Sequence, residues 1–136
     1  MNIGEVKKEL ENYRANNRYI ERKRSEIEQL TEKINKVTAT YSDMPKGSSG
    51  YSREDLIAKK LDIERELCEY WAMLVEQKAE IMRTLQKVEP KYRNILDCVY
   101  IEGMTLEVTA QKEGYSRRQC SRLLNEAYKL YYEAKF

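Results

Sequence analysis

The sequence contains no histidine, and glycine, proline and cysteine are scarce. Its 136 residues include 5 glycines, 2 prolines and 3 cysteines. Without histidine the chain lacks the commonest general base and metal ligand, which excludes a His-dependent catalytic triad and a His-bearing zinc site. Few helix breakers, and a 35% share of charged residues with 25 basic against 23 acidic, are typical of long solvated helices.

The cysteines, Cys68, Cys98 and Cys120, are odd in number and have no CxxC spacing, which argues against a disulfide framework or zinc ribbon. We expect all three to be small buried hydrophobes in a reducing cytoplasm. The first residues lack the apolar core of a signal peptide, and no stretch approaches the ~20 apolar residues of a membrane span. These absences predict a cytoplasmic protein that does not contact a membrane.

The sequence also lacks motifs that are typical of catalysis, phosphate binding or metal binding. No pair of carboxylates and no Gly-rich phosphate loop stands in a context that supports catalysis. Acidic stretches such as 62–66 are more typical of solvated i,i+4 partners of lysine and arginine than of a metal site. The sequence therefore predicts a protein that is not an enzyme and that uses no metal or cofactor.

Two long helical patterns occupy the first two thirds of the chain. Residues 2–41 repeat apolar positions seven apart, at Val6, Tyr13, Ile20, Ile27, Ile34 and Tyr41. Residues 53–88 carry a second seam at Leu56, Ile63, Leu67, Tyr70, Leu74, Ile81, Leu85 and Val88. Each apolar seam would be exposed to water unless another helix packs on it. We therefore expect the two helices to cover each other in a long antiparallel helical hairpin with a loop at 42–51. Ser52, with Asp55 three residues on, predicts the start of the second helix.

A further apolar row widens the second pattern. It consists of Ile57, Leu61, Cys68, Trp71, Val75 and Met82. A face this wide has surface left to cover, and Trp71 could mark where a second copy packs. We therefore expect a homodimer through the hairpin.

Shorter patterns follow Pro90, which should end or kink the second helix. Residues 91–101 form an amphipathic helix that Gly103 is placed to cap. Thr105 can cap a helix over 106–112, 113–115 form a turn, and Ser116 can cap a last helix that runs to about Ala134. The fold class is therefore all-α, with a hairpin domain over 1–89 and a small C-terminal domain over 90–136.

Residues 105–124 have the spacing of a helix-turn-helix. Ala110 is small enough for a close helix crossing, and Gly114 tolerates the positive φ of the turn. Cys120, Leu123, Ala127 and Tyr131 form the buried face of the last helix. The candidate DNA contacts are Ser116, Arg117, Arg118, Gln119, Ser121 and Arg122, with Lys112 placed to reach a phosphate. Tyr128, Tyr131 and Tyr132 cluster near the C-terminal end, where aromatic rings could stack on bases. We expect instead that they pack as amphipathic residues with their hydroxyls reaching solvent.

Residues 89–132 resemble the fourth region of sigma-70 family transcription factors. The matching runs are Glu89-Pro90-Lys-Tyr-Arg-Asn-Ile-Leu, Glu102-Gly-Met-Thr-Leu-Glu-Val-Thr-Ala110 and Glu113-Gly-Tyr-Ser116-Arg-Arg-Gln. The sigma region that reads the other promoter element is absent, so the chain is not a complete sigma factor. The whole architecture resembles phage-encoded late-transcription activators of Gram-positive bacteria and the ArpU and RinA groups. This resemblance implies promoter contacts by Arg117, Arg118, Gln119, Ser121 and Arg122, and host RNA polymerase as a second partner.

The sequence thus favours a sequence-specific regulator, phage or prophage encoded, that binds double-stranded DNA through its last helix. From Ser116 to Tyr132 there are four basic residues and one acidic residue, which suits a phosphate backbone. Two alternatives stay open: a DNA-packaging protein like a small terminase subunit, and a coiled-coil adaptor without a nucleic-acid role. A ring-sized assembly would indicate the first, and the absence of salt-dependent DNA affinity the second.

Overall fold

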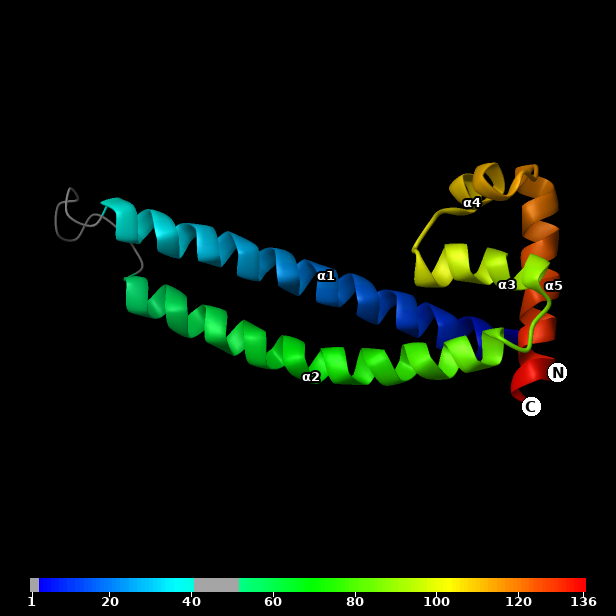
Figure 1. Ribbon diagram of the computed structural model, residues 1–136, viewed down its shortest axis with the longest axis horizontal. Coiled ribbons are helices and arrows are strands. Elements are labelled where there is room, and N and C mark those ends of the chain that lie inside the picture. Colours follow the sequence, from blue (N-terminus) through cyan, green and yellow to red (C-terminus); the bar gives the residue numbers. More distant parts are fainter. Residues whose placement is uncertain (1–2, 41–51) are drawn as a thin grey trace. The chain divides into compact units, whose positions relative to one another are not determined.

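The computed structural model describes residues 3–40 and 52–136, and these residues form helices and no strands. The elements are α1 (Ile3–Thr40), α2 (Arg53–Leu85), α3 (Pro90–Leu96), the π-helix η1 (Asp97–Ile101), α4 (Leu106–Glu113) and α5 (Arg117–Lys135) (Figure 1). The predicted loop at 42–51 lies outside the described residues. The all-α fold class is confirmed.

The chain divides into two compact units, Met1–Asn16 with Leu74–Phe136 and Asn17–Met73. Both long helices contribute to both units, because each unit contains a part of α1 and a part of α2. The domain boundary at 89/90, drawn from the change of pattern at Pro90, stays a prediction.

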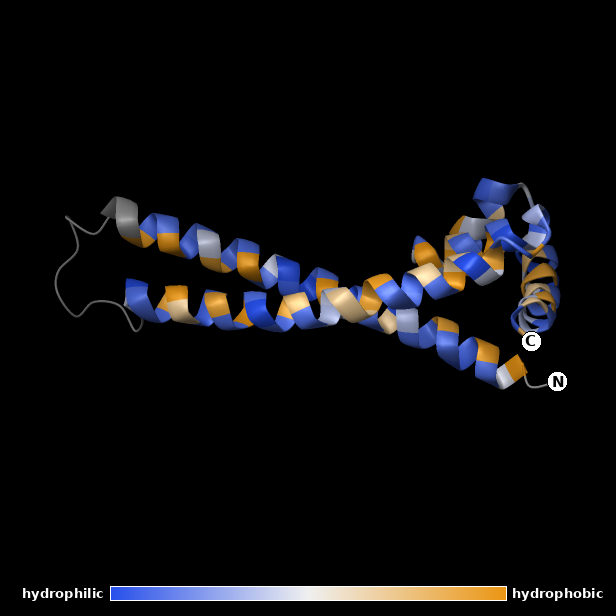
Figure 2. Cartoon of the chain, turned by 60° about the horizontal axis from the view of Figure 1, so that its bottom comes forward, coloured by the Kyte–Doolittle hydropathy of each residue, from blue (hydrophilic) through white to orange (hydrophobic). Residues whose placement is uncertain are grey.

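In the unit Asn17–Met73, the two long helices pack on each other. Leu30 and Ile34 of α1 form one buried cluster with Leu56 and Ile63 of α2. Earlier in α1, the Tyr19 ring lies 4.8 Å from the Tyr70 ring, centroid to centroid, and its hydroxyl donates to the Glu66 carboxylate. Within this unit, the further along α1 a residue lies, the nearer to the start of α2 its partner lies. The hydrophobic residues recur at helical spacing along both helices (Figure 2) because one face of each is covered.

Side-chain caps set the start of α2. The Ser52 hydroxyl accepts from the Asp55 backbone N–H at 3.2 Å, as the sequence predicts. α2 ends at Leu85, earlier than its apolar seam suggests, and Val88 is nevertheless buried in the turn that follows. Pro90 is the first residue of α3, a position where its missing N–H leaves no hydrogen bond unmade.

In the other unit, α3, α4 and α5 share one core. Ile95, Ala110 and Cys120, one from each helix, are buried together. Leu106, Tyr115, Leu123 and Leu124 pack against this cluster. Leu123, which we expected on the buried face, is only half-buried, whereas Ala127 and Tyr131 are fully buried.

The predicted α-helix over 91–101 changes type halfway. After Leu96 it widens into η1, where the Glu102 N–H donates to the Asp97 carbonyl at 2.9 Å. Cys98, Val99 and Tyr100 are all buried. Consecutive side chains of an α-helix point in widely different directions, so three in a row are hard to bury against one neighbour. The rotation per residue is smaller in a π-helix, which brings the three side chains closer to one direction. Gly103 then ends the helix with φ +72°, as predicted.

The tyrosines of α5 correct a second expectation. Tyr128 and Tyr131 are buried at 4% and 0% exposure, so their hydroxyls do not reach solvent freely. The Tyr128 hydroxyl bonds the Tyr100 hydroxyl, and the Tyr131 hydroxyl donates to Glu9 at 3.5 Å. Burial and the Tyr100 hydroxyl raise the pKa of Tyr128. Each buried hydroxyl has found a partner in another helix, which the local pattern does not encode.

Candidate nucleic-acid interface

A left-handed residue makes the turn between α4 and α5. Gly114 has φ 78° and ψ 29°, and its N–H donates to the Gln111 carbonyl at 3.4 Å. The next N–H, of Tyr115, donates to the Ala110 carbonyl at 2.8 Å. These two hydrogen bonds close the end of α4 and turn the chain sharply. Ala110, 3% exposed, then packs with Cys120 of α5.

The first turn of α5 is capped and basic. Ser116 is the N-cap, and its hydroxyl accepts from the Gln119 N–H at 3.1 Å. Arg117 and Arg118 follow, and no acid lies in this first turn. The N-terminal end of a helix carries partial positive charge, and cations there are disfavoured. This arrangement does not favour helix stability, but it concentrates positive potential where an anion can approach.

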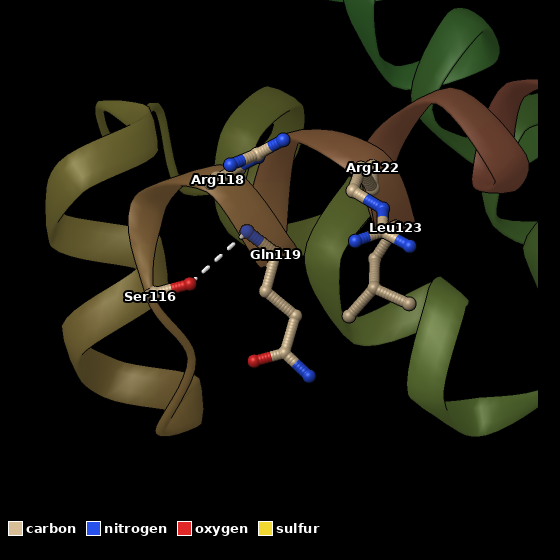
Figure 3. Close-up of a pocket in the computed structure, with 5 residues that line it drawn as sticks. All are labelled: Ser116, Arg118, Gln119, Arg122 and Leu123. Carbon is tan, nitrogen blue, oxygen red and sulfur yellow. Dashed lines mark hydrogen bonds between the residues drawn. The ribbon is translucent and has the colours of Figure 1, made fainter.

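The predicted contact residues lie mostly at the surface. Six of the seven are exposed, namely Lys112, Ser116, Arg117, Arg118, Gln119 and Arg122, and Ser121 is half-buried. Four of them line one pocket of about 390 Å³ with Leu123: Ser116, Arg118, Gln119 and Arg122 (Figure 3).

Two arginines dominate this pocket. Arg118 and Arg122 are four residues apart on α5, which places them on one helix face. Neither has an ion-pair partner among the described residues, and Gln119 lies beside them in the pocket lining. The face thus presents two uncompensated guanidinium groups and a primary amide. That donor set suits acceptor groups on a base edge or a phosphate.

The other two cations among the predicted contacts, Arg117 and Lys112, form ion pairs with acids that the sequence does not predict as partners. The Arg117 Nε lies 2.9 Å from Glu107 Oε1, and the Lys112 Nζ lies 3.1 Å from Glu102 Oε2. The hydrogen bond to Glu102 raises the pKa of Lys112. Lys112 is therefore less available to a phosphate than we expected. The two residues of each pair are ten positions apart, so the helical period of 102–117 does not indicate these pairs.

The two thiols near the turn, Cys98 and Cys120, are buried. The Cys98 Sγ donates to Glu113 Oε1 at 3.5 Å, and burial raises the pKa of Cys98 to about 11. Burial also raises the pKa of Cys120. A thiol that stays protonated is a poor nucleophile and a poor metal ligand. Cys68, by contrast, is exposed, which corrects the expectation that all three cysteines are buried.

Residues 50–131 match the protein family described as "Protein of unknown function (DUF1492)". The match covers more than half of the chain. The chain belongs to the DUF1492 family. The matched range of this DUF1492 protein contains α2 to α4 and most of α5, with the capped basic turn. No curated protein matches it, and no solved structure does. Within the described residues, no helix is long and apolar enough to cross a membrane.

Proposed function

We propose that this DUF1492 protein is a sequence-specific transcriptional regulator that binds double-stranded promoter DNA. In this proposal α4, the Gly114 turn and α5 act as a helix-turn-helix, and α5 enters the major groove. One observation carries the proposal. The first turns of α5 expose Arg118 and Arg122 on one face with Gln119 beside them, and no acid of the part of the chain that the structure describes pairs with either arginine.

The chemistry of these side chains suits base edges. A guanidinium can bind the O6 and N7 atoms of guanine with two hydrogen bonds, and a glutamine amide can do the same with adenine N6 and N7. A major groove about 12 Å wide admits one α-helix. The exposed first turn of α5 would then meet the bases, and the positive helix end would favour the phosphates.

The long helices are proposed to form the antiparallel hairpin that the seams predict, and to serve assembly or partner docking. Leu61 and Trp71 of α2 are 47% and 48% exposed, and Cys68 lies between them at the surface. These three residues follow one face of the helix, because their spacings are seven and three. We propose a homodimer through this face. Light scattering of the wild type should give a dimer mass, and Trp71→Lys should give a monomer; a monomeric wild type would contradict it.

By the resemblance to sigma region 4, host RNA polymerase is proposed as a second partner, with a phage or prophage origin for the chain. A DNA-packaging protein would instead form a large ring in the same light-scattering experiment. A coiled-coil adaptor would show no DNA affinity that falls with salt. A DNA-binding protein should lose affinity steeply as salt rises, with a logarithmic slope near −0.9 for each phosphate neutralised.

The decisive experiment is selection of bound sequences from random double-stranded DNA, followed by gel-shift titration of the winner at several salt concentrations. Arg118→Ala should weaken binding by about 1–3 kcal/mol and relax the preference at one base pair. Lys129→Ala is the matched control, since Lys129 is a cation of the same helix that lies beyond the pocket and pairs with Glu126. Equal binding by wild type and Arg118→Ala would show that this face does not bind DNA.

A further inference from the structure

Leu123 brings an apolar side chain into the pocket at the start of α5. Within the part of the chain that the structure describes, the other residues that line this pocket are polar or charged, namely Ser116, Arg118, Gln119 and Arg122 (Figure 3). Leu123 is half-buried, so part of its side chain is accessible from the pocket. The donors around it suit the polar atoms of a base edge, whereas Leu123 offers only methyl groups.

The hydrophobic core fixes the position of Leu123. On one side it packs against the buried cluster of Ile95, Ala110 and Cys120. A side chain that a close-packed core already holds loses little conformational freedom when a ligand contacts its other side. Leu123 is therefore preorganised for an apolar contact within the pocket.

Gln119 precedes Leu123 by four residues on α5, and the two side chains point to the same side of the helix (Figure 3). Four residues of an α-helix span about 6 Å, and successive base pairs lie about 3.4 Å apart along the duplex. When α5 lies in the major groove, these two side chains therefore reach base pairs that are at most about two steps apart.

Thymine is the base that offers an apolar group in the major groove. Its C5-methyl group lies beside the O4 acceptor, whereas adenine, guanine and cytosine are read there through hydrogen-bond donors and acceptors. Burying one group of this size against an apolar side chain strengthens binding about fourfold. The half-exposed Leu123 is chemically suited to such a methyl group, and the polar lining around it suits the neighbouring base atoms.

We infer that Leu123 contacts the C5-methyl group of a thymine in the bound DNA, and so makes α5 prefer thymine at one position of its site. This inference rests on the proposed function, since it takes double-stranded DNA as the ligand. It adds an apolar contact to the hydrogen bonds proposed for Gln119, Arg118 and Arg122. The contacted thymine should lie within about two base pairs of the base that Gln119 recognises.

Uracil tests this contact, because it differs from thymine only by lacking the methyl group. The DNA site selected by the wild type is synthesised with uracil in place of thymine, one position at a time. Gel shifts then give the ratio of affinities for the thymine and uracil duplexes. For the wild type this ratio should be about four at one position and about one at the others. For Leu123→Ala it should be about one at every position.

This ratio is insensitive to a loss of stability in the variant. The fraction of folded protein affects binding to both duplexes equally, so it cancels from the ratio. Leu123→Ala removes packing from the core and should lower the melting temperature. The ratio nevertheless reports only the contact with the methyl group.

Leu124→Ala is the matched control. Leu124 is also half-buried and packs against the same core cluster, but it does not line the pocket. Its truncation should lower the melting temperature as well, and it should leave the wild-type ratio unchanged. Gln119→Ala should lose its preference for adenine at a position within about two base pairs of the sensitive thymine.

Four results would overturn the inference. The wild type could bind every uracil duplex as tightly as the thymine duplex, or the selected site could contain no thymine. Leu123→Ala could keep the wild-type ratio, or Leu124→Ala could lose it too. Each of these results leaves the proposed function standing, because the wild type still binds a selected site. If the wild type enriches no sequence, the proposed function itself fails, and this inference fails with it.

Discussion

Gly114→Ala tests whether the turn between α4 and α5 is held by backbone conformation alone. Gly114 has φ +78°, a region that residues with a Cβ adopt only under strain. A Cβ built at this position meets no atom within 4 Å. The substitution therefore adds no steric clash, and its whole effect is the conformational strain of a left-handed residue, about 1–2 kcal/mol.

Urea unfolding at 25 °C measures this loss. We expect the midpoint to fall and the slope with denaturant to stay unchanged, since the surface exposed on unfolding is the same. Gly114→Asn should lose less, because asparagine tolerates the left-handed region better than alanine. Gly103→Ala is a matched control, with φ +72° and open space around it, and it should lose a similar amount.

Two results would refute this reasoning. A loss below about 0.3 kcal/mol, within the usual scatter of surface substitutions, would mean that the residue does not hold a positive φ in solution. A loss well above about 2 kcal/mol would mean that α5 packs closer to the turn than the structure shows, so that a Cβ does meet an atom. An equal loss in Gly114→Asn and Gly114→Ala would likewise argue against strain in the left-handed region.

Two further predictions concern the cysteines. In the native protein, a thiol reagent at pH 8 should label only Cys68 quickly, because Cys98 and Cys120 are buried, and it should label all three thiols after denaturation. Cys68→Ser should abolish the fast phase of labelling. Fast labelling of all three thiols in the native protein would contradict the packing of η1 and α5. The pKa of Cys98 rises from 9.0 to about 11 on folding, so between these values the unfolded state binds fewer protons and stability should fall as pH rises. Urea midpoints measured across pH 8–11 should show this fall, and Cys98→Ala should flatten part of it; equal slopes in both proteins would refute the assignment.

Local signals predicted the helix ends well. Ser52, Thr105 and Ser116 each cap a helix start through a side-chain oxygen, and Gly103 and Gly114 end helices with positive φ. These features depend on residues three or four positions apart, which a sequence displays directly. Most seam residues of α1 and α2 are buried as predicted, because burial follows the helical period. Ile27, Leu67 and Tyr70 are only half-buried, and Tyr41 lies outside the described residues.

Contacts between residues far apart in the sequence could not be predicted from local patterns. Local periodicity does not require the change from α3 to η1, which rests on three consecutive buried residues. The exposure of Cys68 depends on which face of α2 its neighbours cover. The partners of Arg117 and Lys112 come from α4 and from the segment before it, so the free cations of the candidate site could be separated from the paired ones only in three dimensions.

The sequence alone determined that this protein is helical, where most of its helices begin and end, and that its last helix starts with a capped, basic turn. It did so because helical period, caps and left-handed glycines are written in neighbouring residues. Only the tertiary structure decided which cations of the described residues pair with acids, that Tyr100 and Tyr128 bond to each other in the core, and that Glu107 forms an ion pair with Arg117. Those outcomes depend on how separate helices pack, and packing brings together residues whose spacing in the chain carries no period.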